Sequence, residues 1–148
     1  MTTATLSPLD RLAHLAAQRT ARTDRLQEAV HTLLGLLESH VEVGDQAMVD
    51  GCSLERRSVR TNVGSSSYWA FGCPDGEGIC HLNRGVGTQG YVHGDFDAGY
   101  RGPTRIELVQ FGLHAKTLIE DLCKDLEKEG LQIEQALNVT QDAIKALV

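Results

Sequence analysis

SYWAFGCPDGEGICHLNRG, from Ser67 to Gly85, contains the pattern that decides the fold. Two apolar stretches with β-type residues, Ser67–Cys73 and Ile79–Arg84, flank the turn sequence Pro74–Gly78, which predicts a β-hairpin. Twelve of the fifteen glycines and six of the seven aromatic residues lie between Gly44 and Gly102. We therefore expect residues 44–102 to form a small antiparallel β segment.

Two more strands are expected in the same segment, at Leu54–Asn62 and Tyr91–Phe96. Because side chains alternate along a strand, Arg56 and Arg60 should project from one face of the first of these strands. Such a polar face is unusual for a core strand. It makes both arginines candidate ligand-binding residues.

Residues 7–43 predict one long helix that ends before Gly44. Ser7 is a suitable N-cap, and Pro8 suits the first helical turn. One series of positions then recurs at alternating spacings of four and three, which is typical of a coiled-coil seam. The series comprises Leu12, Ala16, Arg19, Thr23, Leu26, Val30, Leu33, Leu37 and His40. This pattern predicts self-association through helices.

Residues 103–148 predict a helical hairpin or a kinked helix. Thr104 and Glu107 form a capping-box sequence after Pro103, so a helix should begin there and reach about Lys128. Gly130 is expected to break or bend it before a last amphipathic helix. The chain is thus expected to be one α+β domain over residues 1–148, with three helices around a small sheet.

Charge and composition limit the possible partners. The formal net charge of −6 and a pI near 5.4 argue against nonspecific binding of nucleic acid or anionic membranes. No apolar run is long enough to span a bilayer, and the start of the chain does not resemble a signal peptide. The four cysteines form no CxxC pair, so neither a metal nor another cofactor is expected, and a cytoplasmic location is the simplest expectation.

Glycines after the predicted hairpin suggest a backbone-rich anion cradle. Gly85, Gly87 and Gly90 follow Arg84 in a GxGxxG pattern, which lets backbone N–H groups approach a phosphate. The following Tyr91 begins a β-like segment rather than a helix, which excludes a dinucleotide-binding domain of the Rossmann type. A purely structural turn is the alternative.

Arginines also bracket the start of the C-terminal helix. Arg101 and Arg105 lie where free backbone N–H groups and the helix dipole favour an anion, which makes this the strongest phosphate-site candidate. In the hairpin, Trp69 or Phe71 could stack on a base and Asn83 could bind its edge. The alternatives are ordinary surface ion pairs for the arginines and core positions for the rings.

Catalysis is not expected from this sequence. It contains no nucleophile elbow and none of the paired HxT motifs of two-histidine phosphoesterases. A small hydrolase is an alternative, which would need His81 or His93 close to an acid and a nucleophile. A non-enzymatic binding protein is the leading interpretation.

The order of a hairpin with aromatic and Asn-Arg residues, followed by an arginine-bearing helix, resembles the phage-encoded Thoeris anti-defence proteins. The resemblance covers residues 67–107 and implies sequestration of a cyclic ADP-ribose signal. Trp69 or Phe71 would stack on the base, Asn83 would supply polar recognition, and Arg101 with Arg105 would bind phosphate.

The sequence therefore predicts a homo-oligomeric protein that binds an anionic small molecule such as a nucleotide. A structural or protein-interaction module that uses coiled-coil helices without any ligand is the alternative.

Overall fold

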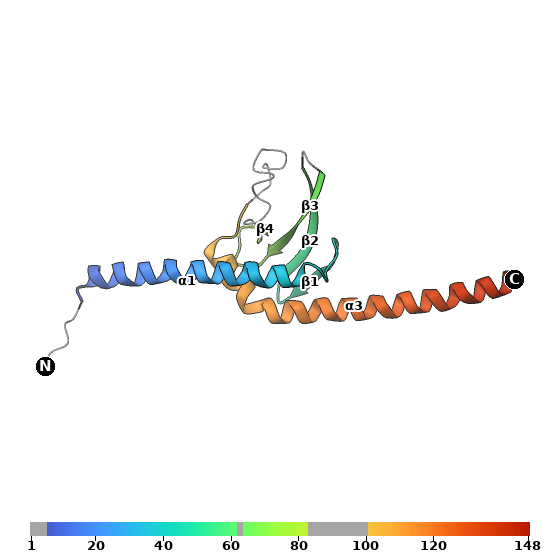
Figure 1. Ribbon diagram of the computed structural model, residues 1–148. Helices are drawn as coiled ribbons and strands as arrows, with labels where there is room; N and C mark the ends of the chain where they lie inside the picture. Colours follow the sequence, from blue (N-terminus) through green and yellow to red (C-terminus); the bar gives the residue numbers. More distant parts are fainter. Residues whose placement is uncertain (1–5, 62–63, 83–100) are drawn as a thin grey trace.

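The computed structural model describes residues 6–61, 64–82 and 101–148, and these confirm the predicted α+β class. Helix α1 and helix α3 lie on one side of a four-stranded antiparallel sheet whose spatial order follows the sequence (Figure 1). The elements are α1 (Pro8–Leu37), β1 (Gln46–Val49), β2 (Cys52–Thr61), β3 (Gly64–Gly72), β4 (Cys80–His81) and α3 (Arg105–Leu147).

Both helices begin where their capping residues predict. The Ser7 Oγ accepts a hydrogen bond from the Asp10 N–H at 3.1 Å, and Pro8 occupies the first turn of α1. At the start of α3, the Glu107 N–H donates to Thr104 Oγ1 and the Thr104 N–H donates to the Glu107 carboxylate. This reciprocal capping box satisfies two backbone donors that a helix start leaves without a partner.

Two predicted helix boundaries are wrong. Helix α3 continues for 43 residues through Gly130, so the described residues contain two helices rather than three and no helical hairpin. A glycine inside a helix costs only about 1 kcal/mol, which the strong helix formers on both sides offset. Helix α1 ends at Leu37 instead of residue 43, because the chain then turns to place Val41 in the core.

Strands that follow one another in the chain pair antiparallel in the sheet. Strands β2 and β3 pair from Ser53–Gly72 to Thr61–Gly64, and the Pro74–Gly78 segment connects β3 to β4 as the sequence predicts. Strand β1 was not predicted, since its four residues are too short to show a clear alternation. The predicted strand at 91–96 lies outside the described residues.

A two-residue turn joins β1 to β2. Asp50 and Gly51 both have positive φ, 52° and 81°, which is the geometry of the type I′ turn that favours Asp-Gly in hairpins. A Cβ atom added at Gly51 would lie 2.9 Å from Cγ of Pro74. Gly51 is therefore required both by its backbone conformation and by the neighbouring chain.

Gly51→Ala is expected to lower the free energy of unfolding by about 1–2 kcal/mol, because alanine is strained at positive φ and would press on Pro74. Urea unfolding followed by circular dichroism measures this change. Gly35→Ala, in α1 where the added methyl meets open space, should instead leave stability unchanged or raise it. Equal midpoints for Gly51→Ala and the wild type would contradict the assigned turn.

The core lies between the inner face of the sheet and the two helices. Leu54, Trp69 and Phe71 project from that face, and their exposed fractions are 0%, 2% and 0%. Phe71 packs edge-to-face on Phe111 of α3, with ring centroids 5.4 Å apart. The body of the protein is this sheet with the parts of the helices packed on it.

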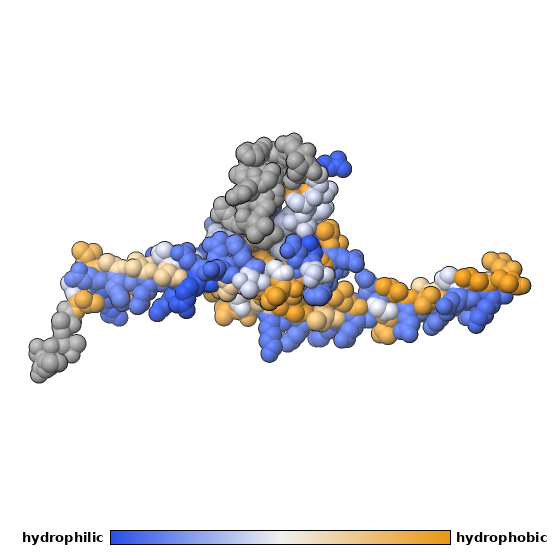
Figure 2. Space-filling model, in the orientation of Figure 1, coloured by the Kyte–Doolittle hydropathy of each residue, from blue (hydrophilic) through white to orange (hydrophobic). Residues whose placement is uncertain are grey.

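Each helix extends beyond the body, in opposite directions (Figure 1). We call residues 8–25 of α1 the α1 arm and residues 123–147 of α3 the α3 arm; neither contains a buried residue. Figure 2 shows hydrophobic residues at the outer end of each arm. Neither α1 nor α3, the two helices in the described ranges, has a stretch long and apolar enough to cross a membrane.

Candidate functional site

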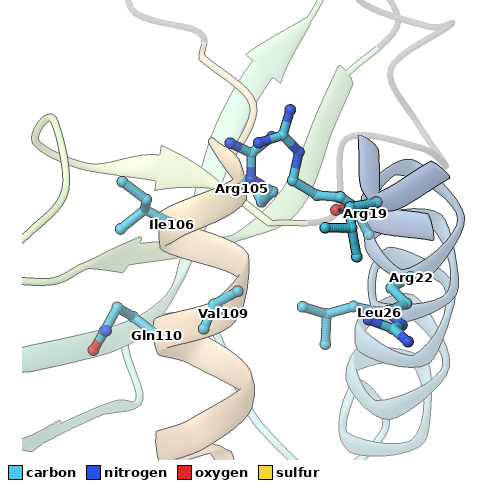
Figure 3. Close-up of a pocket in the computed structure, with 9 residues that line it drawn as sticks. Arg19, Arg22, Leu26, Arg105, Ile106, Val109 and Gln110 are labelled. Carbon is cyan, nitrogen blue, oxygen red and sulfur yellow. Dashed lines mark hydrogen bonds between the residues drawn. The ribbon is translucent and has the colours of Figure 1, made fainter. Parts of the chain in front are cut away.

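A groove of about 470 Å³ lies between α1 and the first turns of α3 (Figure 3). We call it the interhelix groove. Apolar side chains from both helices line it together with three arginines. The lining residues are Leu15, Arg19, Arg22, Thr23, Leu26, Arg105, Ile106, Val109 and Gln110. Its volume is within the range of pockets that hold small molecules.

Helical periodicity brings these residues together. Arg19, Arg22 and Leu26 are three and four residues apart on α1, so they share one face of that helix. In Figure 3, Leu26 and Val109 face each other across the groove, while Arg19 and Arg105 approach the same end of it from the two helices. Apolar side chains therefore run along the groove, with Arg19 and Arg105 at one end and Arg22 beside Leu26.

The arginines of the groove have no acidic partner in the described part of the chain. The ion pairs found there involve Arg56, Arg57 and Arg101. Guanidinium groups that converge without a carboxylate repel one another, and a bound anion would remove that repulsion. Arginine's planar fork also matches phosphate and carboxylate oxygens in a bidentate way.

The two arginines predicted to act together at the start of α3 have different surroundings. Arg105 lines the interhelix groove, whereas Arg101 donates two 2.7 Å hydrogen bonds to the Glu107 carboxylate. Glu107 is fully buried and also accepts a hydrogen bond from the Glu77 N–H at 3.1 Å. The chain's own carboxylate thus occupies the anion position beside Arg101.

Electrostatics around Glu107 favour its ionised form. The hydrogen bonds from Arg101 and from the backbone at Thr104 and Glu77 outweigh burial and lower the pKa of Glu107 to about 2. Arg101 also donates to the Gly78 carbonyl at 3.2 Å, so it joins the β3–β4 connection to the start of α3. These contacts give Arg101 a structural role.

Arg56 likewise contacts the chain itself. Its guanidinium donates to the carbonyls of Glu38 and Val41 and, at 2.9 Å, to Ser67 Oγ. The guanidinium carbon lies 5.8 Å from the ring centroid of Trp69. On the polar strand face predicted from the sequence, Arg56 therefore connects the segment after α1 to the sheet through hydrogen bonds.

The remaining predicted residues that the structure describes do not line the interhelix groove. Trp69 and Phe71 occupy core positions, as the alternative interpretation of the rings held, and Arg60 is exposed on β2. Five others lie outside the described residues: Asn83, Arg84, Gly85, Gly87 and Gly90. Of the predicted residues within the described ranges, Arg105 alone lines the groove.

A second polar cluster lies on the outer face of the sheet. The His81 ring stacks on Tyr68 with centroids 4.0 Å apart, and Arg57 forms a 2.7 Å ion pair with Glu55. Burial, together with the charges of Arg57 and Arg101, lowers the pKa of His81 to about 4. The imidazole is therefore neutral at physiological pH.

The cysteines are free thiols, and burial raises the pKa of Cys80 to about 12. Within residues 6–61, 64–82 and 101–148, no group of three or more His, Cys, Asp or Glu side chains is placed to hold a metal.

Sequence reasoning missed Arg19 and Arg22 as candidate ligand-binding residues. One signal was present, since Arg19 occupies a position of the apolar seam where a charge is unusual. Its proximity to Arg105 depends on how α1 packs on α3. No family model, curated protein or solved structure matches the chain.

Proposed function

We propose that this protein is a homo-oligomeric binding protein that holds a phosphorylated small molecule in the interhelix groove. The observation that carries this proposal is the convergence of Arg19 and Arg105, without a carboxylate partner among the described residues, at the end of an apolar groove. A nucleotide, linear or cyclic, is the ligand class that we favour.

The lining supports a ligand with two chemically different parts. The arginines would bind phosphate oxygens, while Leu26, Ile106 and Val109 would contact an apolar or planar part such as a base. An inorganic ion would leave that apolar surface uncovered. We therefore expect a nucleotide to bind more tightly than inorganic phosphate.

Binding without chemical change fits the groove better than catalysis. Among its lining residues, Thr23 has the only hydroxyl, and it donates at 2.8 Å to the Arg19 carbonyl. Within the described part of the chain, no carboxylate, histidine or cysteine lines the groove to act as a general base or nucleophile. A sequestering role of the kind that the Thoeris resemblance implies needs no such group.

The second candidate function is a protein-interaction module. The exposed apolar residues of the two arms favour it, because they require a protein partner and not a small molecule. This alternative gives an oligomer whose groove binds none of the nucleotides.

Arg105→Ala and Arg19→Ala are each expected to weaken nucleotide binding by about tenfold or more, since each removes a charged hydrogen-bond donor from the ligand. Native mass spectrometry with a panel of linear and cyclic nucleotides identifies the ligand, and isothermal titration calorimetry then gives its affinity. Arg25→Ala, an exposed arginine on the same helix that does not line the groove, is the matched control.

A nucleotide that binds the wild type and Arg25→Ala but binds Arg105→Ala weakly, and is released unchanged, supports the proposal. Equal nucleotide affinity of all these variants would show that the ligand binds outside the groove. An oligomer that binds none of the panel would favour the interaction module.

A further inference from the structure

The α3 arm carries a continuous apolar stripe with nothing packed on it in the described chain. Its large apolar members are Leu126, Ile133, Leu137, Ile144 and Leu147, whose exposed fractions range from 40% to 89%. With Gly130 and Thr140 they follow alternating spacings of four and three, the period of a seam that packs on another helix. An isolated helix with such a stripe exposes a large apolar surface to water, which is unfavourable.

The acidic flanks of this stripe argue against pairing between two α3 arms. Glu127 and Glu134 lie on one side of it and Glu129 on the other. A parallel pair would place Glu129 of one copy beside Glu134 of the other, and an antiparallel pair would place like flanks together. Either arrangement brings glutamates against glutamates, which is unfavourable.

The α1 arm offers a surface of complementary charge. Leu9 and Leu12 are 74% and 64% exposed, so the arm also has an uncovered apolar stripe, which Leu15, a lining residue of the interhelix groove, continues toward the body. Arg11 and Arg22, about three helical turns apart, lie on one flank of that stripe, and Arg22 also lines the groove. Residues 8–25 contain two aspartates and four arginines, of which Arg19 and Arg22 also line the interhelix groove. Residues 123–148 contain five acidic residues and three lysines.

The directions in which the two arms run determine which arrangement of subunits gives a closed dimer. Both helices run the same way along the molecule, with the α1 arm leaving one end of the body and the α3 arm leaving the other (Figure 1). A two-fold axis perpendicular to this direction, beside the body, would lay each α1 arm antiparallel to the α3 arm of a second copy. The closed dimer then contains two identical contacts, each between the α1 arm of one copy and the α3 arm of the other. No arm is left to bind further subunits.

We propose that the arms form a reciprocal dimer interface, in which the basic α1 arm of each copy packs on the acidic α3 arm of the other. This deepens the oligomeric part of the proposed function and rests on it. The apolar stripes provide the stabilisation, while the arginine and glutamate flanks select this pairing over two α3 arms.

Two charge insertions test the interface. Leu12→Asp and Leu137→Asp each place a carboxylate in the seam, and each should weaken the dimer by about tenfold or more. The dimer dissociation constant is measured by analytical ultracentrifugation and native mass spectrometry. Ala17→Asp and Gln135→Asp, on the opposite faces of the same helices, are the matched controls and should leave it unchanged. Circular dichroism confirms that every variant stays helical.

Mixing the two variants, one of them ¹⁵N-labelled, distinguishes the reciprocal interface from other pairings. The mixed dimer contains one contact with both substitutions and one contact with neither, so it should form more readily than either variant alone. A wild-type monomer, an unaffected Leu12→Asp dimer, or no recovery on mixing would overturn the proposal. Arg105 lies on neither arm, so Arg105→Ala should remain dimeric even when it loses the nucleotide. Arg19→Ala is left out of this comparison because Arg19 belongs both to the groove and to the α1 arm. With Arg105→Ala, failure of the interface and failure of the ligand site are separate results.

Discussion

Replacing Glu107 with glutamine is expected to lower the free energy of unfolding by about 3 kcal/mol at pH 7. Glutamine nearly preserves the shape of the side chain but removes the charge that Arg101 binds through two 2.7 Å hydrogen bonds. Its amide also cannot accept all the bonds that the carboxylate accepts from Arg101, Thr104 and Glu77. The residue is fully buried, so water cannot replace the lost partners.

The same substitution should flatten the dependence of stability on pH. The pKa of Glu107 is lowered from an ordinary 4.5 to about 2 by Arg101 and the surrounding N–H groups. A lowered carboxyl pKa stabilises the folded state fully above about pH 4.5, and this contribution is lost as the pH falls through about 2. The difference between wild type and Glu107→Gln should therefore be largest near pH 7 and smallest near pH 2.

Urea unfolding at several pH values, at fixed protein concentration, measures both effects. Glu120→Gln, which removes an exposed carboxylate from the same helix outside the α3 arm, is the control and should change the unfolding free energy by less than about 0.5 kcal/mol. A Glu107→Gln protein as stable as the wild type at pH 7 would show that the ion pair with Arg101 contributes no net stability.

Arg56→Ala is expected to cost about 2–4 kcal/mol, because it leaves the carbonyls of Glu38 and Val41 without their donor. The alanine also loses the hydrogen bonds to Ser67 and the contact with the Trp69 ring. Arg56→Lys should recover only part of this loss, since an ammonium group cannot reproduce the planar fork.

Arg60→Ala is the matched control for this experiment. Arg60 projects from the same face of β2 but is exposed, so its removal should change stability by about 0.5 kcal/mol at most. Nucleotide affinity is measured on the same proteins under conditions where each is folded. If Arg56→Ala lost binding while keeping wild-type stability, Arg56 would be a ligand residue instead of a structural one.

Local signals in the sequence predicted the helix starts correctly. Ser7 with Pro8, and Thr104 with Glu107, determine their helices through contacts within one turn, which can be read from neighbouring residues. The helix end predicted at Gly130 was wrong, because the free-energy cost of one glycine in a helix is smaller than the helix preference of the residues around it. Strand β1 was missed because its pairing with β2 depends on the Asp50–Gly51 turn more than on its own four residues.

The predicted binding residues differ from those that line the groove because their contacts are with residues distant in the sequence. The sequence showed Arg56 and Arg101 as charged residues in suitable places, but not the carbonyls and the buried carboxylate that bind them. Arg19 and Arg105 are brought together by the packing of α1 on α3. A pattern of residue types indicates which side chains can bind an anion, whereas only the fold determines which of them are already bound.

The unbroken length of α3 makes it a mechanical lever. Its 43 residues extend about 64 Å from Arg105, in the groove, to Leu147 at the tip of the α3 arm. The helix continues through Gly130, so a tilt of about 5° at the groove would move the tip by roughly 6 Å, more than the pitch of one helical turn. A small displacement at one end of this helix is amplified at the other end.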